Sequence, residues 1–276
     1  WMYHFLFGAF DKMYYCFRLT NGMDLKREIE KFVIDNKNHF QEMITRLSGS
    51  PRIRLSRSKT NEYVFEAFQR YPNRLIPFCR IDRYLEENLN KGFRGVKLHL
   101  LYEDIEIKNI KKELQLIEDA NVPLLVHARF LNKVKQIEQI LKYAPNINII
   151  LAHMGRGHLY TGEQTIENAL ALRKYPNLYM DLSTVGDLQA IINVCEIIGY
   201  DRVIYASDYP FGKNYLNGEY NYSDELNILK HHLSGENGEN VFHKNIESLL
   251  NKKEEVFIRR AKNDDVDSVV YIFNNM

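Results

Sequence analysis

Two histidines and one aspartate each stand at the end of a short apolar run, and these residue types can bind a metal ion together. The runs are residues 123–127 (PLLVH), 148–153 (NIILAH) and 202–208 (RVIYASD), which end at His127, His153 and Asp208. Each run is typical of a buried strand of a parallel sheet, whose two faces are both covered. Ligands of α/β folds bind at the carboxyl ends of such strands. The pattern therefore predicts one site with the imidazole and carboxylate ligands that zinc and related metals prefer.

Helical and strand patterns alternate along the chain from about residue 61 onward, where Asn61 is placed to cap a first helix. Strands that alternate with helices at this spacing form right-handed βαβ units around a parallel sheet. Because a closed barrel needs eight strands, the first two should precede residue 61. The predicted fold class is α/β, a TIM (β/α)8 barrel that can be incomplete or atypical at its N-terminus. The six expected strands cover residues 75–79, 93–98, 123–127, 148–153, 178–182 and 202–208.

The first 60 residues fit this pattern poorly and leave two interpretations open. Residues 24–47 fit a long amphipathic helix through Leu25, Ile29 and Phe32. The same stretch contains residues 32–40 (FVIDNKNHF), which also fit a strand that ends in a polar cluster, and residues 51–55 fit a second strand. The chain begins at Trp1 and stops after Met276, and we expect it to be a fragment at both ends.

Composition and charge argue against several classes of function. An apolar content of 45% and a charged content of 26% are those of a soluble globular protein. The formal net charge of +1 gives no reason to expect a nucleic-acid or membrane partner. The three cysteines are scattered and lack metal-binding spacing, which favours reduced thiols in a cytoplasmic protein. No apolar run approaches the length of a membrane span, and the N-terminus lacks the basic region of a signal peptide.

Seven segments occur in a regular order between residues 61 and 250: residues 61–74, 92–99 (GFRGVKLH), 123–127, 151–155 (LAHMG), 177–183 (NLYMDLS), 206–211 (ASDYPF) and 245–250 (NIESLL). This ordered set resembles the amidohydrolase superfamily, in the branch that includes aminocarboxymuconate-semialdehyde decarboxylase. The resemblance implies a metal-dependent TIM barrel in which His127 is a metal ligand. It further implies that Asp208 is a metal ligand and proton acceptor, and that His153 is a ligand or an acid–base residue. A homodimer is also a reasonable expectation on this resemblance.

One departure from that family concerns its first metal ligands. Members carry a His-x-His pair at the end of the first strand, and this sequence contains no such pair. The nearest candidate is residues 35–39 (DNKNH), which place Lys37 at the first histidine position and His39 at the second. A lysine ligates a cation after losing its proton, which near neutral pH requires a large pKa shift. We therefore expect His39 as a fourth ligand and a weakened or lost metal affinity.

Three further residues are candidates for substrate binding or the active site. Lys97 and His99 are two positions apart on one predicted strand and so share a face. We expect a structural or substrate-binding role for Lys97, rather than that of a metal bridge. Arg129, two residues beyond His127, could bind a substrate carboxylate through its fixed fork of donors, or it could lie on the surface.

A second resemblance begins after the barrel. Residues 257–273 (FIRRAKNDDVDSVVYIF) resemble the opening strand and first helix of a GNAT-type acetyltransferase. This gives an expected domain division into residues 1–252, an amidohydrolase-like barrel whose first 60 residues match poorly, and residues 253–276, the truncated start of a GNAT-like domain. This piece is too short to catalyse acetyl transfer.

The combined prediction is a cytoplasmic, metal-dependent enzyme acting on a small molecule. It would hydrolyse a small amide or ester, with Asp208 taking the proton and His153 stabilising the developing charge, or decarboxylate a small acid, with Asp208 handling the proton on carbon. The metal is expected to be zinc, with manganese or iron as alternatives. The alternative hypothesis is a catalytically impaired barrel that serves as a binding module beside an acetyltransferase. A nuclease is disfavoured because the chain has no basic stripe.

Overall fold

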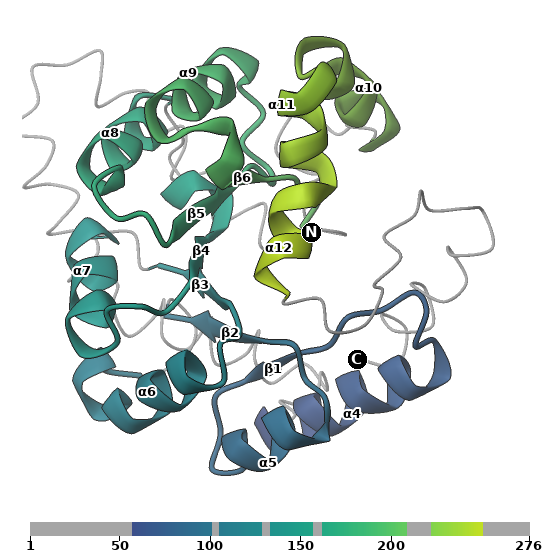
Figure 1. Cartoon of the computed structure of the whole chain (residues 1–276), viewed down its shortest axis with the longest axis vertical. Coiled ribbons are helices and arrows are strands. Elements are labelled where there is room, and N and C mark those ends of the chain that lie inside the picture. Colours follow the sequence, from purple (N-terminus) through teal and green to yellow (C-terminus); the bar gives the residue numbers. More distant parts are fainter. Residues whose placement is uncertain (1–56, 101–104, 129–132, 157–161, 209–221, 251–276) are drawn as a thin grey trace, which may run out of the picture. The chain divides into compact units, whose positions relative to one another are not determined.

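Six short strands in the described part of the chain form one parallel sheet in the order β1-β2-β3-β4-β5-β6 (Figure 1). The computed structural model describes residues 57–100, 105–128, 133–156, 162–208 and 222–250, which all fall within one folded unit. All six predicted strands are confirmed, although each is shorter than expected. The two strands expected before residue 61 lie outside the described residues. The strands are β1 Phe78–Arg80, β2 Gly95–His99, β3 Leu124–His127, β4 Ile149–Leu151, β5 Leu178–Asp181 and β6 Val203–Ile204.

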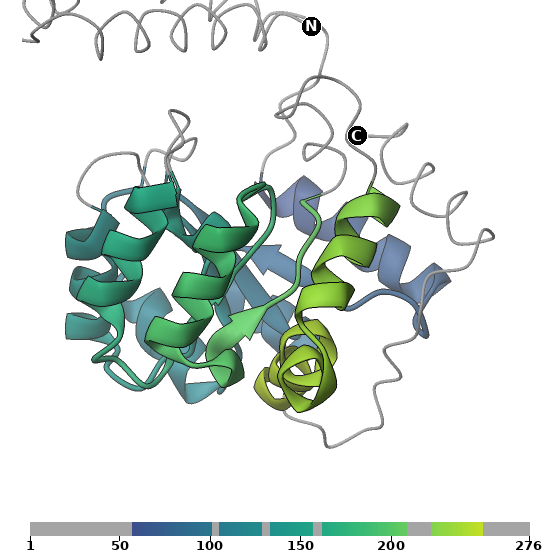
Figure 2. The same ribbon diagram turned by 90° about the horizontal axis from the view of Figure 1, so that it is seen from above.

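Helices separate successive strands, as a parallel sheet requires. Helices α6 to α9 flank one side of the sheet, and α12 lies on the other side (Figures 1 and 2). No helix within the described ranges is long and apolar enough to cross a membrane. The helices are α4 Arg57–Arg70, α5 Leu85–Lys91, α6 Lys111–Asp119, α7 Lys133–Tyr143, α8 Gly162–Leu172, α9 Leu188–Ile198, α10 Tyr222–His232, α11 Gly235–Glu239 and α12 Asn245–Leu249, with shorter turns η1 Ile107–Asn109, η2 Ala152–Gly155, η3 Tyr200–Arg202 and η5 Asn240–Lys244.

The two faces of the sheet differ in chemistry because side chains alternate along each strand. One face is apolar and packs against the helices, and its members include Val96, Leu124 and Ile149, which are neighbours in register and fully buried. The opposite, inner face carries Lys97 and His99 on β2, and the pairing places His99 directly beside His127. Among the described residues, His99 and His127 therefore lie side by side at the carboxyl ends of their strands, on the inner face.

Helix α12 packs against the inner face of the sheet at β4 and β6. Its residue Leu249 forms a buried apolar cluster with Ile150 of β4 and Ile204 of β6. The buried side chain of Asn245 fixes the helix, because its amide donates hydrogen bonds of 2.8 and 2.7 Å to the carbonyls of Tyr200 and Val203. The part of the inner face around Ile150 and Ile204 is therefore apolar and buried.

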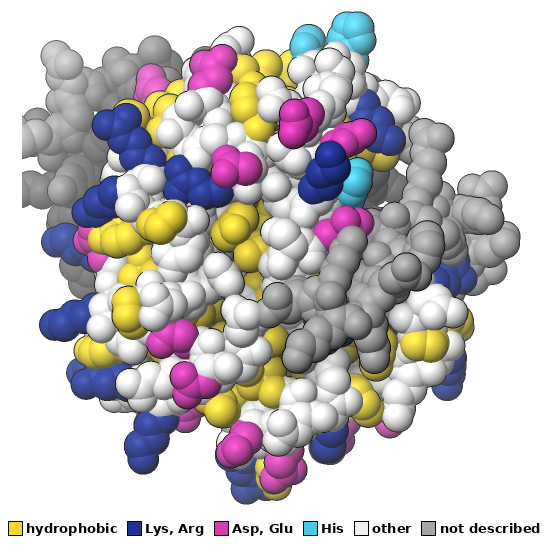
Figure 3. Space-filling view, viewed as in Figure 1, with side chains coloured by type: hydrophobic (Ala, Val, Ile, Leu, Met, Phe, Trp, Pro, Cys, Tyr) yellow, Lys and Arg dark blue, Asp and Glu magenta, His cyan; other side chains and the backbone are white. Residues whose placement is uncertain are grey.

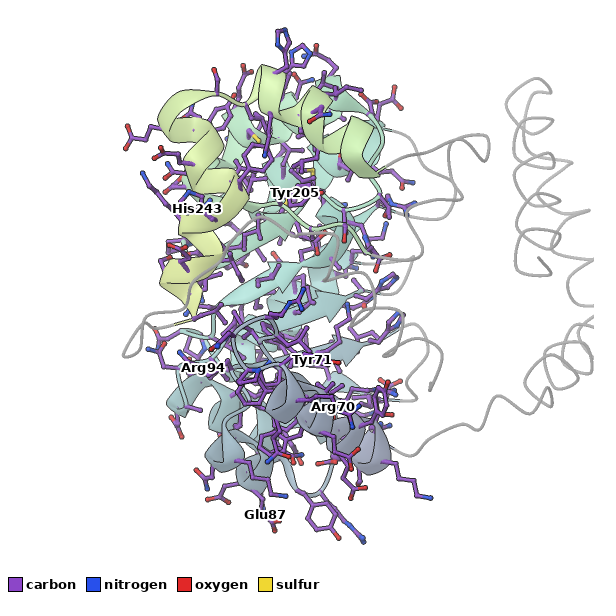
Figure 4. All side chains as sticks on the ribbon, turned by 90° about the vertical axis from the view of Figure 1, so that its right-hand side faces the viewer. Arg70, Tyr71, Glu87, Arg94, Tyr205 and His243 are labelled. Carbon is purple, nitrogen blue, oxygen red and sulfur yellow. The ribbon has the colours of Figure 1, made fainter. Side chains whose placement is uncertain are left out.

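Tyr205 and His243, which are labelled in Figure 4, show how the helical segment of residues 240–249 lies against the sheet. Tyr205, which follows β6, lies beside these helices (Figure 4), and its ring centroid is 5.6 Å from that of Phe242. The backbone N–H of Tyr205 donates to the carbonyl of Val241 at 2.8 Å. His243 points away from the sheet (Figure 4) and is paired with Glu247 at 3.5 Å. His243 therefore belongs to the surface of these helices.

The expectation that Asn61 caps a helix is wrong. Helix α4 already includes Arg57, and Asn61 lies within it with its side chain buried. Its amide oxygen accepts from the Arg80 N–H at 2.7 Å, and its amide nitrogen donates to the Arg80 carbonyl at 2.9 Å and to Asp82 Oδ2 at 3.0 Å. An amide carries both a donor and an acceptor, so Asn61 satisfies both backbone groups of Arg80 at the end of β1.

Replacing Asn61 by leucine should destabilise the fold, because the backbone groups of Arg80 would stay buried without their partners. We expect a loss of about 3 kcal/mol in the free energy of unfolding, measured by urea denaturation. The matched control is Asn90→Ala on the exposed side of α5, which should cost much less. Equal stability of the two variants would contradict the anchoring role of Asn61.

Candidate active site

Three imidazoles and one carboxylate meet at the carboxyl ends of the strands. His99 ends β2, His127 ends β3, His153 follows β4 and Asp208 follows β6. The rings of His99 and His127 are stacked, with centroids 4.1 Å apart and an interplanar angle of 11°. His153 meets His127 edge-on, and its Nε2 lies 3.2 Å from His127 Nδ1 and 4.0 Å from Asp208 Oδ2. The structure thus brings together the three residues predicted from the ends of apolar runs.

The ring of His153 is fixed from behind by Ser183 and Asp181. Asp181 Oδ1 accepts hydrogen bonds from the Ser183 hydroxyl at 2.5 Å, the Ser183 N–H at 3.0 Å and the His153 N–H at 2.9 Å. Because the Ser183 hydroxyl donates its proton to Asp181, its oxygen accepts from His153 Nδ1, 2.8 Å away. The network therefore assigns the proton of the neutral imidazole to Nδ1. The lone pair of Nε2 is left to face His127 and Asp208.

The backbone is strained at this site. Five non-glycine residues in the described ranges have positive φ, and four of them, His153 (57°), Met154 (50°), Thr184 (54°) and Asp208 (49°), surround the imidazoles. A left-handed conformation costs such residues free energy and persists where the surrounding structure fixes it. Strain of this kind clusters at functional sites, so its location supports the assignment of this cluster as the active site.

Burial and nearby charged side chains set the pKa values of His99, His153 and Asp208. Burial lowers the pKa of His153, although the carboxylates of Asp181 and Asp208 partly oppose the shift. Burial raises the pKa of Asp208, against the influence of His153 and Lys97. The pKa of His99 falls to about 4, first because the ring is buried and second because Lys97 is close. The site therefore favours the neutral forms of His99 and His153 and a carboxyl group of Asp208 that keeps its proton to higher pH than usual.

The predicted substrate-binding and metal residues divide into two groups. Lys97 shares the inner face of β2 with His99, as expected, and its charge acts on His153 and Asp208. Arg129 and His39, together with Lys37, lie outside the described residues. The roles of these residues stay predictions.

Three residues of the site were missed by sequence reasoning. Asp181 ends the apolar run of β5 as His127 ends that of β3, so the same signal was available for it. Ser183 had no signal, because a serine after a strand is ordinary turn chemistry. Arg156 joins the site through Thr184, whose hydroxyl oxygen accepts from its Nε at 3.1 Å and its Nη2 at 2.5 Å.

The described donors fit part of a divalent metal site. Two nitrogens bound at about 2.0–2.1 Å around a tetrahedral ion lie about 3.3 Å apart, and His127 Nδ1 and His153 Nε2 lie 3.2 Å apart. The Asp208 oxygen is a third donor of suitable chemistry, but its distance of 4.0 Å from His153 Nε2 is longer than that spacing. Within the described ranges, no three His, Cys, Asp or Glu side chains form a ready-made metal site. A bound ion would need Asp208 to approach and further ligands to join.

The pKa of His99 predicts a pH dependence of stability in chelator-treated protein. Between pH 6.5 and about 4 the unfolded chain binds a proton at this ring that the folded chain does not. The free energy of unfolding should therefore fall as the pH falls through this window, by at most about 3 kcal/mol from this residue. The variant His99→Phe keeps an aromatic ring without a titrating group and should flatten the slope.

The control for this measurement is His231→Phe, at the exposed end of α10. It should keep the slope of the unmodified chain in urea titrations between pH 4 and 7. If His99→Phe and His231→Phe have the same slope, the buried, neutral state of His99 is refuted.

The Ser183 hydroxyl should determine the tautomer of His153. In chelator-treated protein, ¹⁵N NMR of the ring nitrogens should show the proton of His153 on Nδ1, and Ser183→Ala should shift the proton toward a mixture of both nitrogens. Ser248→Ala, whose hydroxyl bonds the Asn245 carbonyl instead, serves as the control and should change nothing. A proton on Nε2 of His153 in the unmodified chain would refute the assignment.

Comparison with known proteins places these observations in a family. None of the curated protein sequences matches the chain significantly. Among solved structures, a protein from Pseudomonas putida provisionally named 2-pyrone-4,6-dicarboxylic acid hydrolase is 17% identical, with a TM-score of 0.59, over 71% of this chain and 78% of that one. A dihydroxybenzoic acid decarboxylase from Polaromonas with bound manganese is 16% identical, with a TM-score of 0.55, over 72% and 76%. A 5-carboxyvanillate decarboxylase from Novosphingobium aromaticivorans, also with manganese, is 17% identical, with a TM-score of 0.54, over 70% and 69%.

The fold shared with these structures is the TIM barrel, as predicted. The family described as amidohydrolase (Amidohydro_2) matches residues 46–252, which are 207 of the 276 residues. The match begins before the first described strand and ends two residues after the described part of the chain. No part of it reaches residues 253–276, where the GNAT-like segment is expected and which lie outside the described residues. From the sheet, the strand-end residues and this match, the chain belongs to the amidohydrolase family.

Proposed function

We propose that this protein is a divalent-metal-dependent enzyme that decarboxylates a small cyclic carboxylic acid. The observation that carries the proposal is the convergence of His127 Nδ1, His153 Nε2 and Asp208 Oδ2 at the carboxyl ends of the strands. These three residues would hold the metal, which would orient the substrate and stabilise negative charge on its oxygens. The remaining chemistry would be done by side chains of the chain itself.

Asp208 would supply the proton. In the chain without metal, burial raises the pKa of this carboxyl group, which favours its protonated form there. Its proton would pass to the ring carbon that bears the carboxylate. The carbon–carboxylate bond would then break, its electron pair would return to the ring, and carbon dioxide would leave. Asp208 would end as a carboxylate and regain its proton from solvent, so the step needs no oxidant or reductant.

The substrate class is suggested by the three structures with this fold. Their names refer to a pyrone dicarboxylic acid, a dihydroxybenzoic acid and 5-carboxyvanillate, which are all small cyclic carboxylic acids. Lys97 stands on the inner face of the sheet beside the cluster and could pair with an acid group of this kind. Arg129, two residues past His127, is proposed to assist in the same way.

Hydrolysis of a small ester or amide is the second candidate. It is favoured by the hydrolase from Pseudomonas putida, whose TM-score of 0.59 exceeds those of the two decarboxylases. In this reaction Asp208 would accept a proton instead of donating one, and His153 would stabilise the charge that develops on the carbonyl oxygen. The two reactions need the same residues and differ in the initial protonation of Asp208.

The metal and the partners are part of the proposal. Zinc is expected from the sequence, but the two decarboxylases contain manganese, so we propose a divalent metal and would test both ions. Basic and acidic side chains both occur on the face shown in Figure 3. A small-molecule substrate, with no nucleic-acid partner, is part of the proposal and rests on the near-neutral charge of the sequence. A homodimer is proposed on family grounds alone.

Metal analysis and assays of carbon dioxide release test this function. With manganese or zinc supplied, the purified chain should bind about one ion and decarboxylate a member of a panel of hydroxybenzoic acids. His127→Ala and Asp208→Ala should each lower metal occupancy and reduce kcat/KM at least 100-fold, since a metal ligand and the proton donor are removed. His231→Ala should match the unmodified chain.

Three outcomes separate the possibilities. Ester or amide cleavage without carbon dioxide release would favour the hydrolase. Metal binding that persists in both His127→Ala and Asp208→Ala would contradict the proposed site. No metal, even with excess ion, would support the catalytically impaired binding module, as expected if Lys37 replaces the first family ligand.

A further inference from the structure

Lys133 is a buried cation that the proposed reaction does not use. It is the first residue of α7, and its exposed fraction is 7%. Lysine is almost never so deeply buried unless it is paired. No hydrogen bond or ion pair joins Lys133 to any residue in the described ranges, and the charge that acts on it most is another cation, Arg156.

This arrangement costs free energy in the absence of a ligand. Burial, and then the nearby Arg156, lower the pKa of Lys133 to about 8. Most of the ammonium groups are still protonated at neutral pH, so the chain keeps two positive charges near each other, one of them deeply buried. An anion placed beside them would relieve both the repulsion and the lost solvation.

The position of Lys133 connects it to the active site. Helix α7 follows β3, which ends at His127, so Lys133 lies at the same edge of the sheet as the imidazoles. Arg156, whose charge acts on Lys133, also lies near the imidazoles. The Thr184 oxygen that accepts its hydrogen bonds is 3.2 Å from His153 Nδ1. Arg156 acts on the proton affinity of both His153 and Asp208. The N-terminus of α7 adds partial positive charge from its backbone N–H groups.

We propose that Lys133 and Arg156 form an anion subsite that binds a second acidic group of the substrate. One acid group would occupy the cluster of His127, His153 and Asp208, and the other would pair with Lys133 at the edge. The substrate class would then be a small cyclic diacid rather than a monoacid. This inference rests on the proposed function, since it assumes a small acid at the neighbouring site.

A matched pair of lysine variants tests the subsite. Binding of benzene-1,3-dicarboxylate and of benzoate is measured by isothermal titration calorimetry on the full chain, first with Mn²⁺ supplied and again with chelator present. The diacid should bind the unmodified chain at least tenfold more tightly than benzoate does. Lys133→Met should remove this preference and leave benzoate binding unchanged. Lys135→Met removes the same charge from an exposed position of α7 and should keep the preference.

A second measurement covers a failure of Lys133→Met to fold. Acetic anhydride at pH 8 labels neutral amines, and mass spectrometry of the unmodified chain reports the labelling of each lysine. Benzene-1,3-dicarboxylate should protect Lys133 at least fivefold more than benzoate does, and should leave Lys135 unprotected. Equal binding of the two acids, an equal effect of both variants, or equal protection of both lysines would overturn the subsite.

The results also separate this inference from the proposed function, because binding and labelling are measured without turnover, and binding is measured both with and without metal. A chain that decarboxylates monoacids but shows no diacid preference would overturn the subsite and leave the function standing. A chain without metal or activity that still prefers the diacid through Lys133 would support the subsite and contradict the function.

Discussion

The geometry of the candidate active site depends on hydrogen bonds to the carboxylate of Asp181. One of its oxygens accepts from two backbone N–H groups and one hydroxyl, and so joins the turn after β4 to the turn after β5. Both turns contain left-handed residues, His153 in the first and Thr184 in the second. Hydrogen bonds to a carboxylate are stronger than neutral ones, and here they offset the strain that orients the His153 ring. Without these hydrogen bonds the His153 ring would be free to rotate away from His127.

The inner face of the sheet carries both part of the apolar core and the candidate active site. Leu249 of α12 packs against Ile150 and Ile204 on this face. The upper edge of the face carries His99 and His127 in parallel register. Burial, together with the nearby Lys97, lowers the pKa of His99 to about 4, and burial raises the pKa of Asp208. Burial within the folded chain therefore sets proton affinities on which the proposed chemistry depends.

The strands and the three strand-end residues could be predicted because their signal is local. An apolar run that ends in His127 or Asp208 indicates both a buried strand and a candidate functional residue at the end of that strand. Asn61 could not be predicted correctly, because its partners at Arg80 and Asp82 are distant in sequence and a helix-start asparagine is ordinarily a cap. Lys133 gave no signal for a related reason: a lysine that opens a helix is normally solvated, and its burial arises only from tertiary packing.

The proposed chemistry requires that His127, His153 and Asp208 bind one and the same metal ion. Anomalous diffraction from crystals of the full chain soaked in Mn²⁺ would locate that ion. We expect a single strong peak at the carboxyl ends of the strands, within about 2.0–2.3 Å of one nitrogen of each histidine and an oxygen of Asp208. A fully occupied manganese elsewhere on the chain, or none at the strand ends at saturating concentration, would contradict the shared site.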